Sequence, residues 1–68
     1  MFGIIILNGD RPDIVLENGI LYGGLHCGDC FQYYENGWLD VRLEYTDEWT
    51  LICCGKYLPI RYGSAVKI

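Results

Sequence analysis

The sequence predicts an all-β domain built as an antiparallel meander, and three observations support this. Apolar residues occupy every second position from 39 to 45, which is the period of a strand with one buried face. Asn-Gly pairs at 18–19 and 36–37 predict tight hairpin turns, because both residue types tolerate positive φ. No window keeps apolar residues at helical spacing for longer than one turn. Short strands at regular spacing are therefore expected along the chain.

The first part of the chain is expected to contain a buried strand followed by a hairpin. Residues 2–7 are apolar and rich in β-branched side chains, which favours a strand covered on both faces. Residues 8–13 include a glycine and a proline and are expected to turn. Residues 14–17 and 20–22 would then pair around the first Asn-Gly turn, and two glycines at 23–24 break the chain.

The middle of the chain holds the clearest strand signals. Residues 30–35 form the next expected strand, and the second Asn-Gly turn leads into a strand that begins at Trp38. The side chains of this strand that are expected to point into the core are those of Leu39, Val41, Leu43 and Tyr45. Trp38 then lies on the solvent face, an unusual location for so large an apolar side chain. After a turn at 46–48, residues 49–54 return as another strand.

Size and composition predict one folded domain that spans residues 1–68. Chains this small often depend on disulfides, a metal or a partner subunit. However, hydrophobic residues make up 51% of this chain, and six tyrosines, two tryptophans and two phenylalanines can bury large areas. The net charge of −4, with only five scattered Lys and Arg residues, argues against direct nucleic-acid binding. An acidic surface instead suits a basic protein partner, and the alternative is that it serves solubility alone.

The expected location is the cytoplasm. No segment approaches the roughly 18 apolar residues that span a bilayer. The apolar run at 2–7 is too short for a signal peptide and lacks a basic preceding region and a cleavage site. The four cysteines are therefore expected to stay reduced.

Three segments resemble those of SH3-like domains. Gly28-Asp29 matches the pair found at a diverging turn, and Trp38 matches the tryptophan that opens the strand after the next loop. Leu58-Pro59-Ile60-Arg61-Tyr62 is similar to the late segment that forms a single 3₁₀ turn. The resemblance implies a small SH3-like antiparallel barrel with one short 3₁₀ turn before the last strand. Such barrels are used far more for binding than for chemistry.

The chain is also similar to a group of small, functionally uncharacterised bacterial and mobile-element proteins. The shared residues are Leu25 to Asp29 (Leu-His-Cys-Gly-Asp), Gly37-Trp38, Arg42 to Tyr45 (Arg-Leu-Glu-Tyr) and Trp49. This likeness implies a setting in bacterial or phage mobile DNA, and it carries no known activity.

The cysteines allow a metal site, but the sequence predicts none. Cys27 and Cys30 have the spacing of a zinc knuckle, and His26 with Cys53 or Cys54 could complete four ligands. Neighbours in a strand face opposite sides, so only one of the last two could join the site. The alternative is that free cysteines act as small buried hydrophobic residues. A redox Cys-x-x-Cys would open a helix, and no helical pattern follows it here. No cofactor is predicted.

The sequence predicts no enzyme activity. His26 is the only histidine, and its neighbour Cys27 would point to the opposite side of an extended chain. The paired carboxylates Asp47 and Glu48 lie in an expected turn, where solvation is the simpler explanation. No Gly-rich phosphate loop opens a helix.

The predicted binding site is a cluster of aromatic and basic residues. Trp38 and Arg42 share one strand face, and in SH3-like geometry Tyr22 and Tyr62 could approach them to form a groove. The alternative is that Trp38 covers part of its own chain. The leading hypothesis is a non-catalytic module that binds a partner or host protein and inhibits a host enzyme or defence complex.

Two other functions remain open. One is a sponge for a small nucleotide signal, with the base stacked on an aromatic ring and Arg42 or Arg61 on a phosphate. Pairing of residues 2–7 between subunits would give such a sponge a dimer interface, as an alternative to completing the barrel in one chain. The other is a zinc-stapled structural module, which a chelator would unfold.

Overall fold

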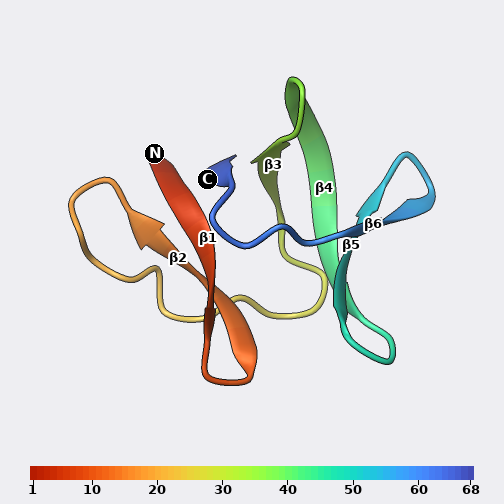
Figure 1. Cartoon of the computed structure of the whole chain (residues 1–68), viewed down its shortest axis with the longest axis horizontal. Helices are drawn as coiled ribbons and strands as arrows, with labels where there is room; N and C mark the ends of the chain where they lie inside the picture. The colour runs from red at the N-terminus through yellow and green to blue at the C-terminus, as the bar shows by residue number, and fades with distance from the viewer.

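The computed structural model describes residues 1–68 and contains strands and turns but no helix, which confirms the expected all-β class. The strands are β1 (Phe2–Asn8), β2 (Arg11–Leu16), β3 (Cys30–Tyr34), β4 (Trp38–Tyr45), β5 (Trp49–Cys53), β6 (Lys56–Pro59) and β7 (Ala65–Lys67). They form one antiparallel sheet in the order β2-β1-β7-β3-β4-β5-β6 (Figure 1). The molecule has no helix with the length and apolar character needed to cross a membrane.

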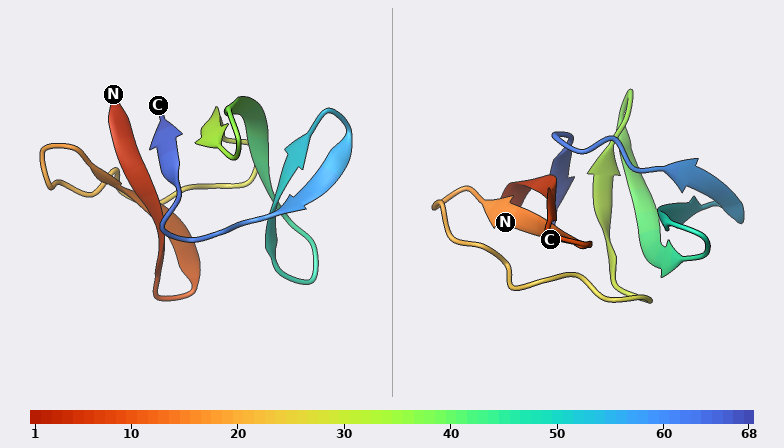
Figure 2. Two further views of the ribbon diagram at one scale, coloured as in Figure 1. Left: turned by 45° about the horizontal axis from the view of Figure 1, so that its top comes forward. Right: turned by 60° about the horizontal axis from the view of Figure 1, so that its bottom comes forward.

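The last strand, β7, joins the two parts of the sheet. It lies between β1 and β3, so that Val66 is opposite Gly3 on one side and Tyr33 on the other. To reach this position the chain after β6 crosses from one edge of the sheet to its middle (Figures 1 and 2). The termini lie side by side, and the amino group of Met1 donates to the carbonyl oxygen of Ile68 at 2.7 Å. Because β2 and β6 remain as edges, the sheet is open and does not close into the expected barrel.

Strand β1 is paired within the chain on both sides, so it completes the sheet and offers no edge to another subunit. Its burial alternates: Gly3 and Ile5 are buried, whereas Phe2 and Ile4 are 48% and 41% exposed. The expectation that both faces are covered is therefore wrong, because the core lies on one face of the sheet. Gly3 allows β2 to approach closely, since a Cβ there would lie 2.5 Å from Cγ2 of Ile14.

The two Asn-Gly turns have different outcomes. Asn36 and Gly37 have φ of 56° and 141° and join β3 to β4 as predicted. The first Asn-Gly pair joins β2 to a segment with only one bridge, between Val15 and Leu21. This segment instead protects the edge of β2 through backbone hydrogen bonds. The expected turn at 8–13 is also shorter, because β2 already begins at Arg11.

The core lies where the inner faces of the strands meet, and Leu25 from the long β2–β3 connection completes it. Its buried hydrophobic residues are Ile5, Ile14, Leu25, Phe31, Tyr33, Val41, Leu43, Leu51 and Val66. The alternation in β4 is confirmed for Val41 and Leu43 on the inside and for Trp38 on the outside. The prediction fails at Tyr45, which is 54% exposed because β4 extends past the core at that end.

The segment between β6 and β7 differs from the expected 3₁₀ turn. Leu58 and Pro59 belong to strand β6, and Pro59 is tolerated there because β6 is an edge strand. After them the chain forms one hydrogen-bonded turn, in which the N–H of Ser64 donates to the carbonyl oxygen of Arg61 at 3.1 Å. This turn presents Tyr62 to the surface.

Candidate functional site

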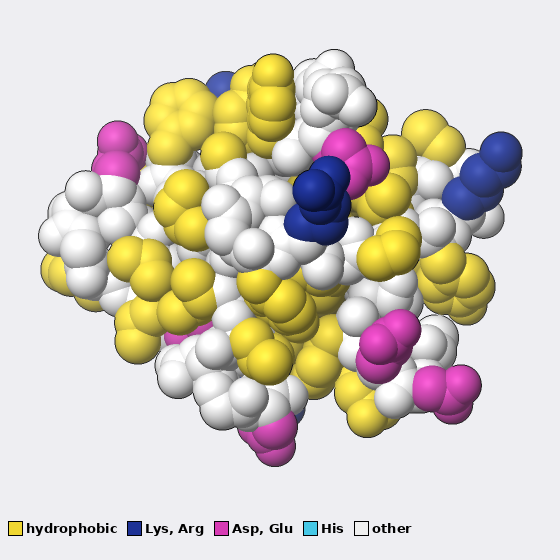
Figure 3. All heavy atoms as spheres, in the orientation of Figure 1, with side chains coloured by type: hydrophobic (Ala, Val, Ile, Leu, Met, Phe, Trp, Pro, Cys, Tyr) yellow, Lys and Arg dark blue, Asp and Glu magenta, His cyan; other side chains and the backbone are white.

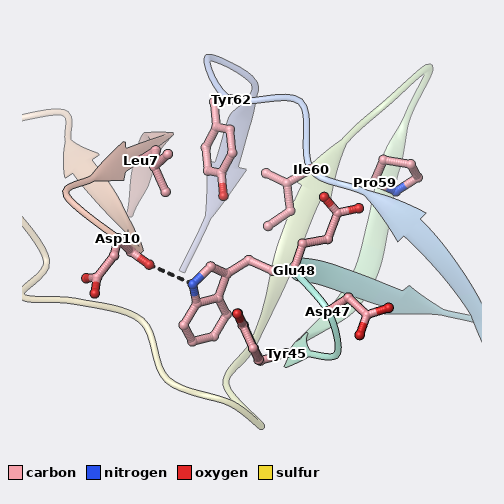
Figure 4. Close-up of a pocket in the computed structure, with 9 residues that line it drawn as sticks. Leu7, Asp10, Tyr45, Asp47, Glu48, Pro59, Ile60 and Tyr62 are labelled. Atoms are coloured by element: carbon pink, nitrogen blue, oxygen red, sulfur yellow. Dashed lines mark hydrogen bonds between the residues drawn. The ribbon is translucent and has the colours of Figure 1, made fainter.

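A groove of about 380 Å³ lies between the β1–β2 turn, the β4–β5 turn and the segment that follows β6 (Figure 4). We call it the aromatic–acidic groove. Its lining residues are Leu7, Asp10, Tyr45, Asp47, Glu48, Trp49, Pro59, Ile60 and Tyr62.

Trp49 is held firmly at the centre of the groove. Its indole Nε1–H donates to the carbonyl oxygen of Asp10 at 2.8 Å, which ties β5 to the β1–β2 turn (Figure 4). The ring of Tyr45, directly opposite Trp49 in the β4–β5 hairpin, packs edge-on with centroids 4.9 Å apart. The guanidinium of Arg11 lies 5.2 Å from the Trp49 ring centroid. Because these contacts already fix the indole, the Trp49 side chain would lose little conformational entropy when a ligand binds.

The groove is acidic. Asp10, Asp47 and Glu48 line it, and neither Lys nor Arg does. Figure 3 shows hydrophobic side chains in the lower middle of this face, with acidic side chains beside and below them and a Lys or Arg side chain above them. Partial burial, and then the negative charge of Glu48, raise the pKa of Tyr62 above its usual 10.0. The same negative potential attracts a cation.

Tyr62 reaches the groove because buried groups anchor its backbone on both sides. The N–H of Arg61 donates to the hydroxyl of the fully buried Tyr33 at 3.0 Å. On the other side, the N–H of Gly63 donates to the carbonyl oxygen of Ile5 at 2.7 Å. Tyr62 points from this segment toward the indole (Figure 4).

Of the five residues predicted to bind a partner or a small ligand, the structure places only Tyr62 in this groove. Trp38 lies in a separate cluster, with its ring centroid 5.3 Å from Tyr34 and 5.8 Å from Phe2. It is 42% exposed, so it covers part of its own chain while keeping a free surface.

The other three predicted residues do not line the groove. Arg42 is on the outer face of β4, where its Nε is 2.7 Å from a carboxylate oxygen of Glu44. Tyr22 lies in the segment that protects the edge of β2. The side chain of Arg61 is exposed and does not line the groove. The structure therefore does not form the single groove that the sequence predicted.

Sequence reasoning missed Tyr45 and Trp49 as site residues. The signal was present, because an aromatic residue stands on each side of the Thr46–Glu48 turn, and such residues face each other across a hairpin. The acidic turn residues between them, read as solvated, form one side of the groove.

The Leu-His-Cys-Gly-Asp motif has a structural role. Asp29 accepts a hydrogen bond from the backbone N–H of His26 at 2.8 Å and so closes a turn. The N–H of Gly28 donates to the carbonyl oxygen of Leu43, and the N–H of Leu43 donates to that of Asp29. These bonds dock the turn on β4 and bury Leu25 in the core.

The residues considered as zinc ligands do not come together. Cys27 and Cys30 are exposed on the docked turn, and the imidazole of His26 points to solvent there. Cys53 is at the end of β5. No group of three or more His, Cys, Asp or Glu side chains lies close enough to hold a metal ion. The close sulfur pair is instead Cys53 and Cys54, with Sγ atoms 3.8 Å apart.

Comparisons with known proteins match almost the whole chain. Residues 3–68 match the model of a family described as a domain of unknown function (DUF5348). A crystal structure of a protein from Ruminococcus gnavus is 31% identical, with a TM-score of 0.83 over 100% of both chains. No curated protein matches the sequence.

Proposed function

We propose that this chain, which belongs to the DUF5348 family of domains of unknown function, is a non-catalytic domain that binds a partner protein. The partner presents a basic segment to the aromatic–acidic groove. In the mobile-element setting that the sequence likeness implies, the partner would be a host enzyme or defence complex. We also propose that the open sheet is a variant of the SH3-like architecture, supported by the late Leu58 to Tyr62 segment that crosses to the last strand.

The observation that carries this proposal is the composition of the groove. Three aromatic rings lie beside three carboxylates, with no cation among the lining residues. Arg and Lys side chains suit such a surface, because they can pair with carboxylates and also stack on aromatic rings. The phosphates of a nucleotide would be repelled by the same carboxylates, which favours a peptide over the sponge alternative.

The two tryptophans allow a direct test. A short arginine-containing peptide is titrated into isotopically labelled protein, alongside a matched peptide with glutamate at each arginine position. The indole N–H signal of Trp49 should shift with the arginine peptide only. The signal of Trp38 should stay unchanged, because its ring packs in a different cluster. A shift of Trp38 in place of Trp49, or an equal response to both peptides, contradicts the proposal.

Charge-matched variants test the acidic rim. Asp47→Asn with Glu48→Gln removes two carboxylates from the groove, and Asp40→Asn with Glu17→Gln removes two from elsewhere. Each exposed charge contributes about 0.5 kcal/mol, so the groove variant should bind the arginine peptide roughly fivefold more weakly. The control variant should bind like the unaltered chain. Equal losses in both variants would show that only net charge matters.

A further inference from the structure

Cys53 and Cys54 form a close pair of thiols that sequence reasoning did not foresee. Cys53 is the last residue of β5, and Cys54 begins the two-residue turn to β6. Adjacent side chains in an extended strand point to opposite faces. Here φ of Cys54 is +55° and φ of Gly55 is +77°, so the strand ends at Cys53 and the rule no longer applies. The two Sγ atoms are 3.8 Å apart as a result.

This separation matches two ligands of one tetrahedral metal ion. Zinc–sulfur bonds are about 2.3 Å long, and at the tetrahedral angle two sulfur ligands of one Zn²⁺ lie about 3.8 Å apart. The distance between the two Sγ atoms therefore already suits bidentate binding. Left-handed φ is rare for a residue other than glycine, and here it places the second thiol beside the first.

The surroundings leave the pair accessible and favour a cation. Cys54 is exposed and Cys53 is half-buried. The carboxylates of Asp40 and Glu35 are close enough to place negative charge around the pair. Lys56 is directly opposite Cys53 in the hairpin and is the one basic residue of this turn. The turn is at the opposite end of β5 from Trp49 (Figure 1), so the pair is separate from the groove.

We propose that Cys53 and Cys54 form half of a binding site for a thiophilic divalent cation such as Zn²⁺, and that the same pair from a second copy completes it. One chain supplies no third ligand nearby, whereas structural zinc sites take four. An exposed turn next to an edge strand can meet its symmetry mate around a two-fold axis. Four thiols bind one Zn²⁺ as thiolates and release four protons to solvent, with no change of oxidation state.

Native mass spectrometry of the reduced chain with added Zn²⁺ tests this. The expected result is a dimer that contains one zinc ion. Cys54→Ser should abolish it, and because Cys54 is exposed and outside the core this variant should fold normally. Cys53→Ser should act in the same way. The matched control, Cys27→Ser with Cys30→Ser, removes the other two thiols and should leave the zinc dimer intact.

Three results would overturn the proposal. They are zinc retained by Cys54→Ser, zinc lost in the Cys27 and Cys30 control, and a chain that stays monomeric and zinc-free. A chelator provides a second readout. It should split the dimer without loss of the β-sheet circular dichroism signal, because none of the nine buried core residues belongs to this turn. Unfolding by the chelator would instead indicate a zinc-stapled fold.

Discussion

Tyr33→Phe tests whether a single buried hydroxyl supports the segment that carries Tyr62. The Tyr33 ring is fully buried, and its hydroxyl accepts the backbone N–H of Arg61 at 3.0 Å. The hydroxyl of Ser64 lies 3.4 Å away and donates to the carbonyl oxygen of Arg61 at 2.6 Å. Replacing Tyr33 with Phe keeps the packing of the ring but leaves the N–H of Arg61 without its partner.

The expected loss can be worked from these contacts. A net hydrogen bond contributes about 1 kcal/mol, and a buried N–H without a partner costs about 1–3 kcal/mol. Because the Arg61 N–H is only partly buried, we expect a loss of about 1–2 kcal/mol in the free energy of unfolding. With a urea m-value of about 1 kcal/mol/M for a chain of this size, the unfolding midpoint should fall by about 1–2 M. Arginine-peptide binding should weaken as well, because Tyr62 follows Arg61.

The neighbouring residue provides the control. Tyr34→Phe removes the same atom from a side chain that is half exposed, so its urea midpoint should stay within error of the unaltered chain. Equal midpoints for Tyr33→Phe and the unaltered chain, or equal losses in both variants, would refute the reasoning. A lower urea midpoint for Tyr33→Phe with unchanged peptide binding would show that the hydroxyl stabilises the fold but does not position Tyr62 in the groove.

Three further predictions concern packing and charge. Gly3→Ala should lower stability by about 1–3 kcal/mol in thermal denaturation, because its Cβ would clash with Ile14; an unchanged melting temperature would contradict this. Burial opposes ionisation of Asp13, but hydrogen bonds from backbone N–H groups outweigh it and lower the pKa below 3.8. The ionised Asp13 carboxylate therefore stabilises the fold fully above the pKa that Asp13 has in the unfolded chain, and this stabilisation is lost as the pH falls through its pKa in the folded chain. The urea midpoint of Asp13→Asn should be lower than that of the unaltered chain at neutral pH, and the two midpoints should converge in acid. Glu48→Gln should lower the pKa of Tyr62 in an NMR titration, and an unchanged pKa would place the carboxylate too far from the ring to affect it.

Local signals predicted much of the fold. Alternation in residues 39–45 placed Val41 and Leu43 in the core and Trp38 outside, because side-chain period follows directly from strand geometry. The Asn36-Gly37 turn followed from its φ preferences. The sequence did not predict strand β6, because Pro59 indicated a turn. A strand can contain this proline only at an edge of the sheet, and edge positions cannot be recognised from local sequence.

The candidate site was harder to predict because its contacts join distant parts of the chain. Trp49 and Asp10 are 39 residues apart, and Tyr33 and Arg61 are 28 apart. The two-residue alternation of apolar side chains predicts a core position for Tyr45, but this alternation does not show where a strand extends beyond the core. The Cys53 and Cys54 pair was rejected by a rule that applies only inside a strand.

The sequence by itself determined the all-β class, most strand positions and an acidic, aromatic surface, because these depend on side-chain chemistry and on neighbours a few residues apart. Only the tertiary structure decided that β7 enters between β1 and β3 and leaves the sheet open. That insertion draws the segment after β6 across the sheet and brings Tyr62 beside Trp49. Such a groove depends on the order in which strands pair, and that order is set by the packing of the whole core.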